Sequence, residues 1–140
     1  MSYLIDTDII SALNKKNLSF KLVQWLKRNE DDCFISHVSV AEIRHGQENA
    51  PASHREELAQ RVTDTEERFA ECFLPVDLDV LTRWKALIRE LKSVNRTMTC
   101  EDSLLAATCL FHGHTMATNN VRHFEPAAQF GLKIENPLAD

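Results

Sequence analysis

The chain has 140 residues, of which 44% are hydrophobic and 26% are charged, and its formal net charge is −5. This composition is typical of a folded globular protein and predicts a single domain over residues 1–140 with a substantial core. The negative net charge gives no general basic surface of the kind expected of a nucleic-acid binder. A nuclease would therefore need a bound metal ion and a local rim of basic residues to offset it.

The four cysteines, Cys33, Cys72, Cys100 and Cys109, are far apart in the sequence. Their spacing excludes a zinc-binding or CxxC redox motif, and we expect core thiols in a reducing cytoplasm. The first apolar run breaks at Asp6, and no stretch is long enough to cross a bilayer. We therefore expect neither a signal peptide nor a transmembrane segment.

An apolar run at residues 3–5 ends at Asp6 and leads into a helical pattern that reaches Leu13. A short run of this kind predicts a strand buried on both faces. Thr7 or Asp8 is expected to cap the helix that follows. Asp6 would then lie at the carboxyl end of a parallel strand, where open α/β sheets bind ligands. The alternative is that Asp6 only helps to cap the helix.

A second helix is predicted after Asn17, ending near the charged residues 28–32, and residues 33–35 predict the next strand. The apolar spacing then predicts a helix that ends near Gly46, with Glu42 on or next to its apolar face. A buried carboxylate needs a partner, because an unpaired buried charge is unfavourable. The alternative is a surface glutamate at the edge of that face.

Residues 51–71 are charge-rich with a thin apolar stripe, which predicts an exposed helix and one arm of a helical hairpin. Ser53 and Glu56 have the spacing of a capping box. Residues 72–76 predict a short strand, and Pro75 places that strand at a sheet edge or at a strand end.

A strongly amphipathic helix is predicted after Asp77. The apolar stripe expected to lie in the core consists of Val80, Leu81, Trp84, Leu87, Ile88 and Leu91. Residues 101–113 predict the clearest helix, ended by Gly113 and packed deep against the sheet. Asp102 lies in its first turn, where the helix dipole favours an anion. The alternative is a helix-start acid with no further role.

Residues 115–117 predict another strand, which ends in the stretch 118–124, and residues 132–134 predict the last strand. Strands and helices therefore alternate along the chain. This alternation predicts an α/β fold, a three-layer α/β/α sandwich around a mainly parallel sheet of about five strands.

Asp6, Glu42 and Asp102 each lie where a strand passes into a helix or where a helix begins. In a parallel sheet such positions can meet at one edge. Three carboxylates without Cys or His partners suit a hard cation, Mg²⁺ or Mn²⁺, which would offset their mutual repulsion. A cation held in this way can activate water and stabilise charge that develops on a phosphodiester.

Four segments carry a family resemblance: YLIDTD at 3–8, ISHVSVAEIRHG at 35–46, EDSLLAAT at 101–108 and ATNNVRHF at 117–124. In this order they resemble PIN domains and, more narrowly, the VapC ribonuclease toxins of type II toxin–antitoxin pairs. The resemblance spans essentially the whole chain. It implies a PIN-like fold and a Mg²⁺-dependent endoribonuclease that cuts RNA, usually tRNA or rRNA. It also implies a homodimer and inhibition by a small cognate antitoxin.

By position in these motifs, Asp6 and Asp102 match the family's principal metal-binding aspartates, and Glu42 matches its characteristic glutamate. The fourth acid of the family falls at Asn120, an amide, which leaves a second metal open. The resemblance assigns Thr118 and Asn120 to orienting a water at the metal.

Asp8 stands where the family often has Asn or Ser. We interpret it as a helix cap, with a metal role as the alternative. Arg44, His45, Arg96 and Arg122 are the candidates for RNA contacts, since they could supply a local cationic rim. The alternative for each is an ordinary surface charge.

Two other functions fit part of the sequence. Asp6 and Asp8 form a DxD pair after a first strand, as in haloacid-dehalogenase-type phosphatases, where Asp6 would be the nucleophile. Against that, Ile10 occupies the place of the motif's Thr or Val, and no convincing lysine motif follows. The second alternative is a PIN-like scaffold that binds RNA or protein without cutting, which the amide at Asn120 allows.

Overall fold

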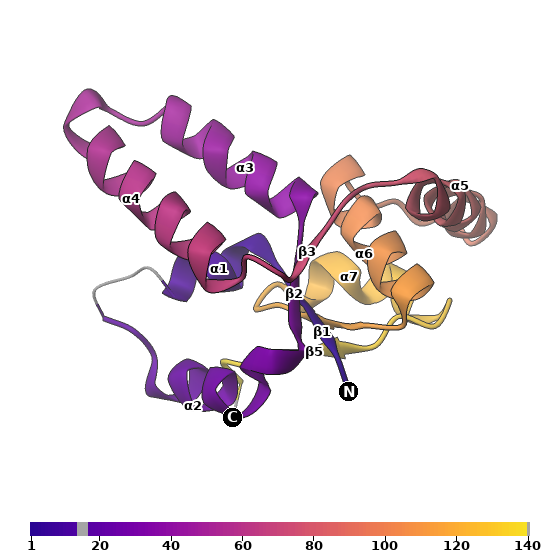
Figure 1. The fold of residues 1–140 in the computed structure, drawn as a ribbon. Coiled ribbons are helices and arrows are strands. Elements are labelled where there is room, and N and C mark those ends of the chain that lie inside the picture. Colours follow the sequence, from indigo (N-terminus) through magenta and orange to yellow (C-terminus); the bar gives the residue numbers. More distant parts are fainter. Residues whose placement is uncertain (14–16, 140) are drawn as a thin grey trace.

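The computed structural model describes residues 1–13 and 17–139, in which five short strands alternate with helices (Figure 1). The strands are β1 (Tyr3–Ile5), β2 (Cys33–Ser36), β3 (Phe73–Leu74), β4 (Thr115–Ala117) and β5 (Ile134–Glu135). The α-helices are α1 (Thr7–Leu13), α2 (Phe20–Asn29), α3 (His37–Glu48), α4 (Ala52–Arg68), α5 (Leu78–Ser93), α6 (Cys100–His112) and α7 (Val121–Ala128). One 3-10 turn, η1 (Glu30–Asp32), precedes β2.

The strands form one parallel sheet in the order β3-β2-β1-β4-β5. In the central strand β1, Tyr3 lies opposite Cys33 of β2 and Thr115 of β4. All three residues of β1 are buried, as predicted for a strand covered on both faces. β3 lies at an edge, as Pro75 indicated, although it is shorter than the predicted range.

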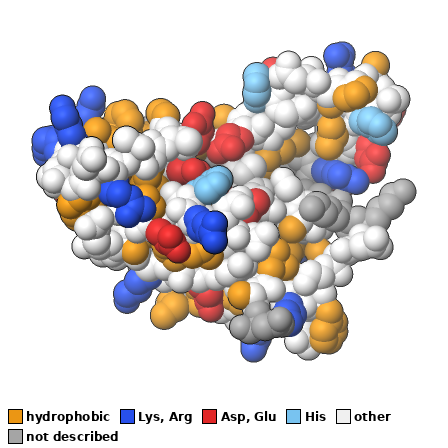
Figure 2. Space-filling model, turned by 180° about the vertical axis from the view of Figure 1, so that it is seen from behind, with side chains coloured by type: hydrophobic (Ala, Val, Ile, Leu, Met, Phe, Trp, Pro, Cys, Tyr) orange, Lys and Arg blue, Asp and Glu red, His pale blue; other side chains and the backbone are white. Residues whose placement is uncertain are grey.

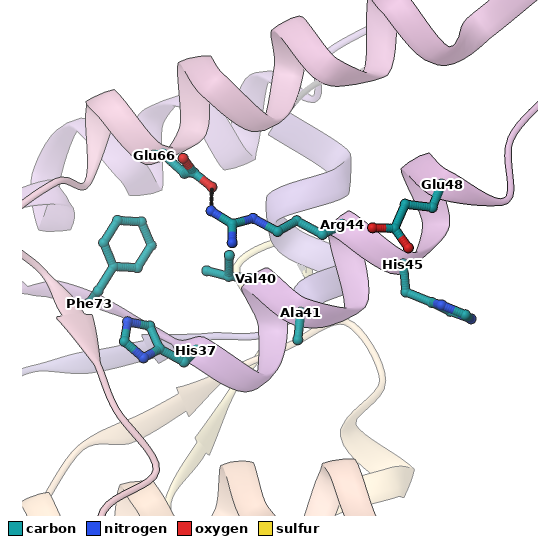
Figure 3. A pocket seen from close by; sticks show the side chains of 8 residues that line it. All are labelled: His37, Val40, Ala41, Arg44, His45, Glu48, Glu66 and Phe73. Atoms are coloured by element: carbon teal, nitrogen blue, oxygen red, sulfur yellow. Dashed lines mark hydrogen bonds and ion pairs between the residues drawn. The ribbon is translucent and has the colours of Figure 1, made fainter. Parts of the chain in front are cut away.

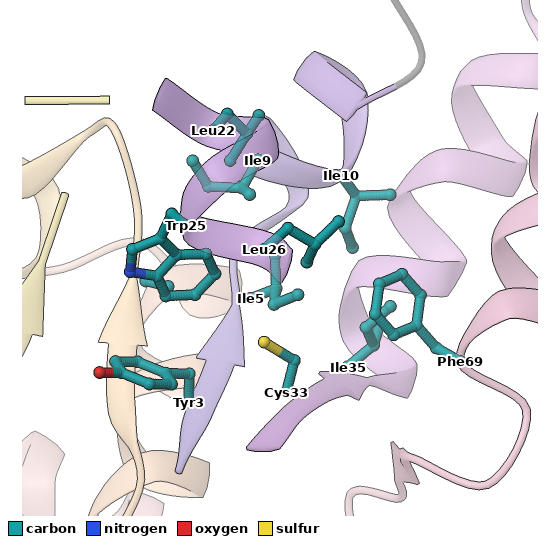
Figure 4. Close-up of a cluster of buried hydrophobic side chains, with 11 residues drawn as sticks. Tyr3, Ile5, Ile9, Ile10, Leu22, Trp25, Leu26, Cys33, Ile35 and Phe69 are labelled. Carbon is teal, nitrogen blue, oxygen red and sulfur yellow. The ribbon is translucent and has the colours of Figure 1, made fainter. Parts of the chain in front are cut away.

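Each face of the sheet carries its own hydrophobic cluster. Side chains alternate along β1, so Tyr3 and Ile5 belong to one cluster and Leu4 to the other. Figure 4 shows the first cluster, in which Trp25 of α2 packs edge-to-face on Tyr3, with ring centroids 4.9 Å apart. The second cluster is built from residues of α5, α6 and α7, including Phe124. These layers confirm the predicted α/β/α sandwich.

Two helix ends follow the sequence signals. The side chain of Asp77 accepts a hydrogen bond from the backbone N–H of Val80 at the start of α5. Gly113 ends α6 in the left-handed region, with φ of 76°, where a residue without Cβ is favoured.

Two other signals are wrong. α3 does not end at Gly46; it continues to Glu48, and the side chain of Asn49 donates to the carbonyl oxygen of His45. The capping box at Ser53 does not form, because α4 begins at Ala52, directly after Pro51 and two residues before the start that an N-cap at Ser53 would give. α3 and α4 nevertheless lie side by side as the predicted helical hairpin (Figure 1).

The largest error concerns the stretch 118–124. We expected it to end a strand, but α7 begins at Val121, and Phe124 and Ala127 pack into the second cluster. Val and Phe favour strands in isolation, and Pro126 argues against a helix. Burial of two apolar residues at a spacing of three outweighs both preferences in this short helix.

Some residues expected in the core lie at its margin. Leu81 and Ile88 of α5 keep 39% and 37% of their surface exposed. The four cysteines are free; Cys33 and Cys109 are buried as expected, whereas Cys100 is exposed at the start of α6. None of the helices in the described ranges combines the length and the apolar character needed to cross a bilayer.

Candidate active site

Asp6 lies directly after the last residue of β1 and is only 6% exposed. Its backbone N–H donates to the carbonyl oxygen of Ala117 at 2.9 Å, which continues the pairing of β1 with β4. One carboxylate oxygen, Oδ1, accepts from the N–H of Thr7 at 2.8 Å. The strand and the first residue of α1 therefore fix the carboxylate at the carboxyl edge of the sheet.

The hydroxyl of Thr118 fixes the other carboxylate oxygen of Asp6. Thr118 is fully buried after β4, and its Oγ1 donates to Asp6 Oδ2 at 2.8 Å. The same oxygen accepts from the backbone N–H of Asn120 at 2.9 Å. Thr118 therefore uses its only hydroxyl hydrogen to hold Asp6.

Glu42 reaches the same region from α3. Thr7 Oγ1 donates to Glu42 Oε1 at 3.4 Å, so the first residue of α1 contacts both acids. The residue as a whole is exposed, which agrees with the alternative of a surface glutamate at the edge of the apolar face. Its pKa is raised because its carboxyl group is partly buried; the bond from Thr7 lowers it, and the nearby Glu101 and Asp102 raise it.

Asp102 comes from the first turn of α6, as predicted. Its backbone N–H donates to the side chain of Thr99 at 3.1 Å, which caps the helix. Its Oδ2 lies 3.4 Å from Nδ1 of His123, on α7. His123 has no sequence spacing typical of a metal ligand, so the sequence predicted no role for it.

The four predicted acidic and amide positions line one open cleft of about 410 Å³. Its lining residues are Asp6, Thr7, Asp8, Ser11, Glu42, Thr99, Glu101, Asp102, Asn120 and His123. Figure 2 shows acidic side chains gathered near the middle of one face of the molecule, with a histidine beside them. The topology thus brings together residues that are far apart in the sequence.

Three carboxylates of this cleft, those of Asp6, Asp8 and Glu42, have no ion pair with a basic residue that the structure describes. Burial, followed by the charges of Asp8 and Asp102, raises the pKa of Asp6 to about 7, although the bonds from Thr118 and Thr7 oppose that shift. Ionised carboxylates in the cleft therefore lower the free energy of unfolding.

Asp8 has a different role from the predicted helix cap. α1 begins at Thr7, and Asp8 Oδ2 accepts from the backbone N–H of Asn119 at 3.0 Å. Its other oxygen, Oδ1, is buried and has no hydrogen-bond partner among the described residues. A buried carboxylate oxygen without a donor is unfavourable unless a cation or water reaches it.

Asn120 precedes α7 at its N-cap position, but its side chain makes no capping hydrogen bond. Its amide lines the cleft beside the acids. This placement agrees with the predicted neighbourhood of Asn120.

A second, larger cavity of about 550 Å³ lies along the α3–α4 hairpin. Figure 3 shows its lining residues: His37, Val40, Ala41, Arg44, His45, Glu48, Glu66 and Phe73. Here Arg44 Nη2 forms an ion pair of 2.6 Å with Glu66 Oε1. We call this cavity the hairpin groove.

Similarity to known proteins identifies the family of the chain. The chain matches the family model of the PIN domain over residues 3–128. It belongs to the PIN-domain family. Among curated relatives, the VapC ribonuclease Y4jK of Sinorhizobium fredii is 31% identical over 136 residues, which cover 95% of both chains. Ribonuclease VapC1 of Rickettsia felis is 26% identical over 126 residues, 89% of this chain and 90% of the relative.

Solved structures share the whole fold of this PIN domain. FitAcB from Neisseria gonorrhoeae aligns over 96% of this chain and 97% of its own, with a TM-score of 0.84 and 26% identity. VapBC2 from Rickettsia felis, bound to a DNA fragment from its promoter, aligns over 97% and 98%, with a TM-score of 0.84 and 20% identity. At that identity the second comparison supports the fold alone.

The donor set of this PIN domain fits a hard divalent cation. The cleft offers carboxylate oxygens from Asp6, Asp8, Glu42 and Asp102. One of these oxygens, Asp8 Oδ1, is buried and accepts no hydrogen bond from the described residues. Across residues 1–13 and 17–139, no three Asp, Glu, His or Cys side chains are already placed tightly enough to hold an ion. The acids therefore line a common cleft rather than form a closed ligand shell.

The basic residues of this PIN domain are distributed unevenly. Arg122 lies in the first turn of α7, between two residues of the cleft lining. Arg44 and His45 line the hairpin groove instead, and Arg96 lies in the loop between α5 and α6. Of the four candidates for RNA contacts, Arg122 is the one adjacent in sequence to cleft-lining residues.

Three titratable cleft residues were missed or misread from the sequence. Asp8 repeats the acid of Asp6 two positions later but was interpreted as a helix cap, and Glu101 adjoins Asp102 but was given no role. His123 becomes recognisable only when residues 121–128 are known to be helical.

Proposed function

We propose that this PIN-domain protein is a divalent-metal-dependent endoribonuclease, the toxin of a toxin–antitoxin pair. The observation that carries the proposal is a cleft at the carboxyl edge of the sheet with at least four carboxylates and no Lys or Arg paired to Asp6, Asp8 or Glu42 in the described residues. Membership of the PIN family and the curated names of two VapC ribonucleases support the same reaction.

Mg²⁺ is the proposed cofactor, with Mn²⁺ as a substitute, and Asp6, Glu42 and Asp102 are its proposed ligands. Asp8 is added to that set because its Oδ1 lacks a donor among the described residues. Mg²⁺ commonly binds through one or two carboxylates and keeps several waters, which suits an open cleft. When bound, the ion supplies an activated water and positive charge for the phosphodiester.

The remaining cleft residues have proposed roles that follow from their contacts. Thr118 holds Asp6 in one orientation through its hydroxyl hydrogen bond. His123 restrains Asp102 from the side of α7. The side-chain amide of Asn120, which lines the cleft and makes no capping hydrogen bond, is proposed to donate to a water or to a phosphate oxygen. Arg122 is the proposed contact to the RNA backbone.

A small cognate antitoxin and a second copy of the chain are the proposed protein partners. The names of similar proteins motivate the antitoxin, including a toxin–antitoxin complex from Klebsiella pneumoniae with a TM-score of 0.70 and 23% identity. Co-expression with the small protein encoded next to this chain tests the proposal. We expect a stable complex that suppresses cleavage, and separate elution of the two proteins would contradict it.

The phosphatase alternative gives Asp6 a different role. Thr7 and Thr118 hold its two carboxylate oxygens by hydrogen bonds, an arrangement that suits a metal ligand and a nucleophile alike. A covalent phosphoryl-enzyme would require this carboxylate as the nucleophile. Radiolabel transferred from a phosphate monoester onto Asp6 would favour the phosphatase.

The nuclease is tested most simply by incubating pure protein with total RNA, with Mg²⁺ and then with excess EDTA, and mapping the new RNA ends. We expect cleavage at a small number of sites with Mg²⁺ and none with EDTA. Equal cleavage in EDTA, or none with either Mg²⁺ or Mn²⁺, would contradict the proposal.

A further inference from the structure

The segment after β5 contacts the turn that carries Thr118 and Asn120. β5 pairs with β4, and the backbone N–H of Thr118 donates to the carbonyl oxygen of Glu135 at 3.0 Å. The next residue, Asn136, then lies beside Asn119. Its Nδ2 donates to Asn119 Oδ1 at 3.1 Å.

Asn136 is itself fixed from the other side. Its Oδ1 accepts from the backbone N–H of Leu138 at 2.9 Å, so both ends of the amide are used. Pro137 is buried, and Leu138 packs against the first hydrophobic cluster. The amide of Asn136 is therefore presented to the turn from an anchored segment rather than from a loose end.

The turn that Asn136 contacts holds two acids of the cleft. Asn119 donates its backbone N–H to Asp8 Oδ2 at 3.0 Å. Thr118 donates its hydroxyl to Asp6 Oδ2 at 2.8 Å. A shift of this turn would therefore move the hydrogen bonds of both carboxylates together.

We propose that Asn136 is a positioning residue for the acidic cleft, acting through the side chain of Asn119 to fix the turn that orients Asp8 and Asp6. This inference rests on the proposed nuclease function. Asn136 does not line the cleft, so it touches neither RNA nor metal in this role. Residues that orient metal-binding side chains commonly change metal affinity and turnover when they are altered.

Exchanging amides for carboxylates tests the bond without removing volume. In Asn136→Asp alone, Asn119 can turn its amide and donate to the new carboxylate, and in Asn119→Asp alone Asn136 still donates. Each single variant therefore keeps one donor and one acceptor. The double variant has two facing carboxylates and no donor, so only the double variant loses the bond.

The double-mutant cycle removes the effect of each added charge taken singly, because each single variant carries one of the two charges. The coupling that remains contains the lost hydrogen bond and the repulsion between the two facing carboxylates, both of which displace the turn. We expect the double variant to lose about five- to tenfold in kcat beyond the product of the single effects, with little change in KM. Binding of Mn²⁺ alone, measured by calorimetry, should show a coupled loss as well. The backbone amide at position 119 should exchange its hydrogen faster only in the double variant.

Additive effects on kcat and on Mn²⁺ binding would overturn the proposal, as would a loss of thermal stability with unchanged kcat and Mn²⁺ affinity. If the wild-type protein cleaves no RNA, the nuclease proposal fails instead. In that case Mn²⁺ binding and amide exchange, which need no substrate, decide the role of Asn136 on their own.

Discussion

The acidic cleft and the hairpin groove differ in how their charges are compensated. The groove is larger, about 550 Å³ against about 410 Å³, yet its Glu66 is neutralised by Arg44. In the cleft, the described residues offer Asp6, Asp8 and Glu42 no paired Lys or Arg, and Asp6 has a raised pKa. Uncompensated charge, rather than cavity size, is therefore the basis on which we propose the cleft as the reactive site.

Removing one acid from each region gives the largest expected contrast. Asp6→Asn should lower RNA cleavage by about a thousandfold or more, because it removes a proposed metal ligand while keeping the side-chain shape. Glu66→Gln in the groove should leave cleavage within about twofold, since its loss affects only an exposed ion pair. Single-turnover cleavage of an RNA identified in the mapping experiment measures both. Comparable activity of Asp6→Asn and wild type would reject the assignment.

The Thr118→Val variant tests how the orientation of Asp6 affects activity while its carboxylate is kept. The variant keeps the shape of the side chain but leaves Asp6 Oδ2 without its buried donor, so we expect kcat to fall about 10- to 100-fold. The free energy of unfolding should fall by about 1–2 kcal/mol, because a buried hydrogen bond is lost. Steady-state kinetics and urea unfolding measure the two effects, and Thr82→Val on the exposed face of α5 is a matched control. Unchanged kcat in Thr118→Val would remove Thr118 from the site.

The pH dependence of stability tests the uncompensated charge itself. Asp6 has a folded-state pKa of about 7 against an ordinary value of 3.8, so the folded state binds its proton more tightly than the unfolded state does. In EDTA, this contribution to stability is complete below pH of about 4 and is lost as the pH rises to about 7. Asp6→Asn should therefore be more stable than wild type at pH 8, by about 1–3 kcal/mol, and the difference should vanish toward pH 4.

Urea unfolding at a series of pH values measures this difference, with Glu66→Gln as the control from the hairpin groove. A gap between Asp6→Asn and wild type that stays constant with pH would show that Asp6 carries no excess charge cost.

Arginine variants should show the smallest difference between the cleft and the hairpin groove. Arg122→Ala, beside the cleft, should raise KM for RNA about three- to tenfold, and the effect should weaken with added salt. Arg44→Ala, in the groove, should leave KM within about twofold and lower stability by less than about 1 kcal/mol, because its ion pair is exposed. Initial rates at two salt concentrations measure this contrast, and a larger KM effect for Arg44→Ala would move the RNA path to the hairpin.

Most of the structural features that position the cleft were predicted from the sequence. The apolar run at residues 3–5 identified the central strand, and the positions of Asp6 and Asp102 at strand and helix ends brought both acids to the carboxyl edge of the sheet. These inferences succeed because a buried parallel strand and a helix start are local patterns with one common geometry.

The remaining features depend on contacts that no local pattern contains. Asp8 contacts Asn119, 111 residues away, so its interpretation as a cap could not be corrected from neighbouring residues. α7 was missed because its stability comes from packing Phe124 and Ala127 into the second cluster rather than from helix propensity. His123 was missed for the same reason, since it reaches Asp102 only from that helix.

Anomalous diffraction from crystals soaked in Mn²⁺ tests the central claim most directly. The uncompensated carboxylates predict one strong anomalous peak in the cleft, within ligand distance of Asp6 or Asp102, and its loss in Asp6→Asn. A peak confined to other surface carboxylates, or a cleft that stays empty of Mn²⁺ at saturating concentration, would contradict the claim.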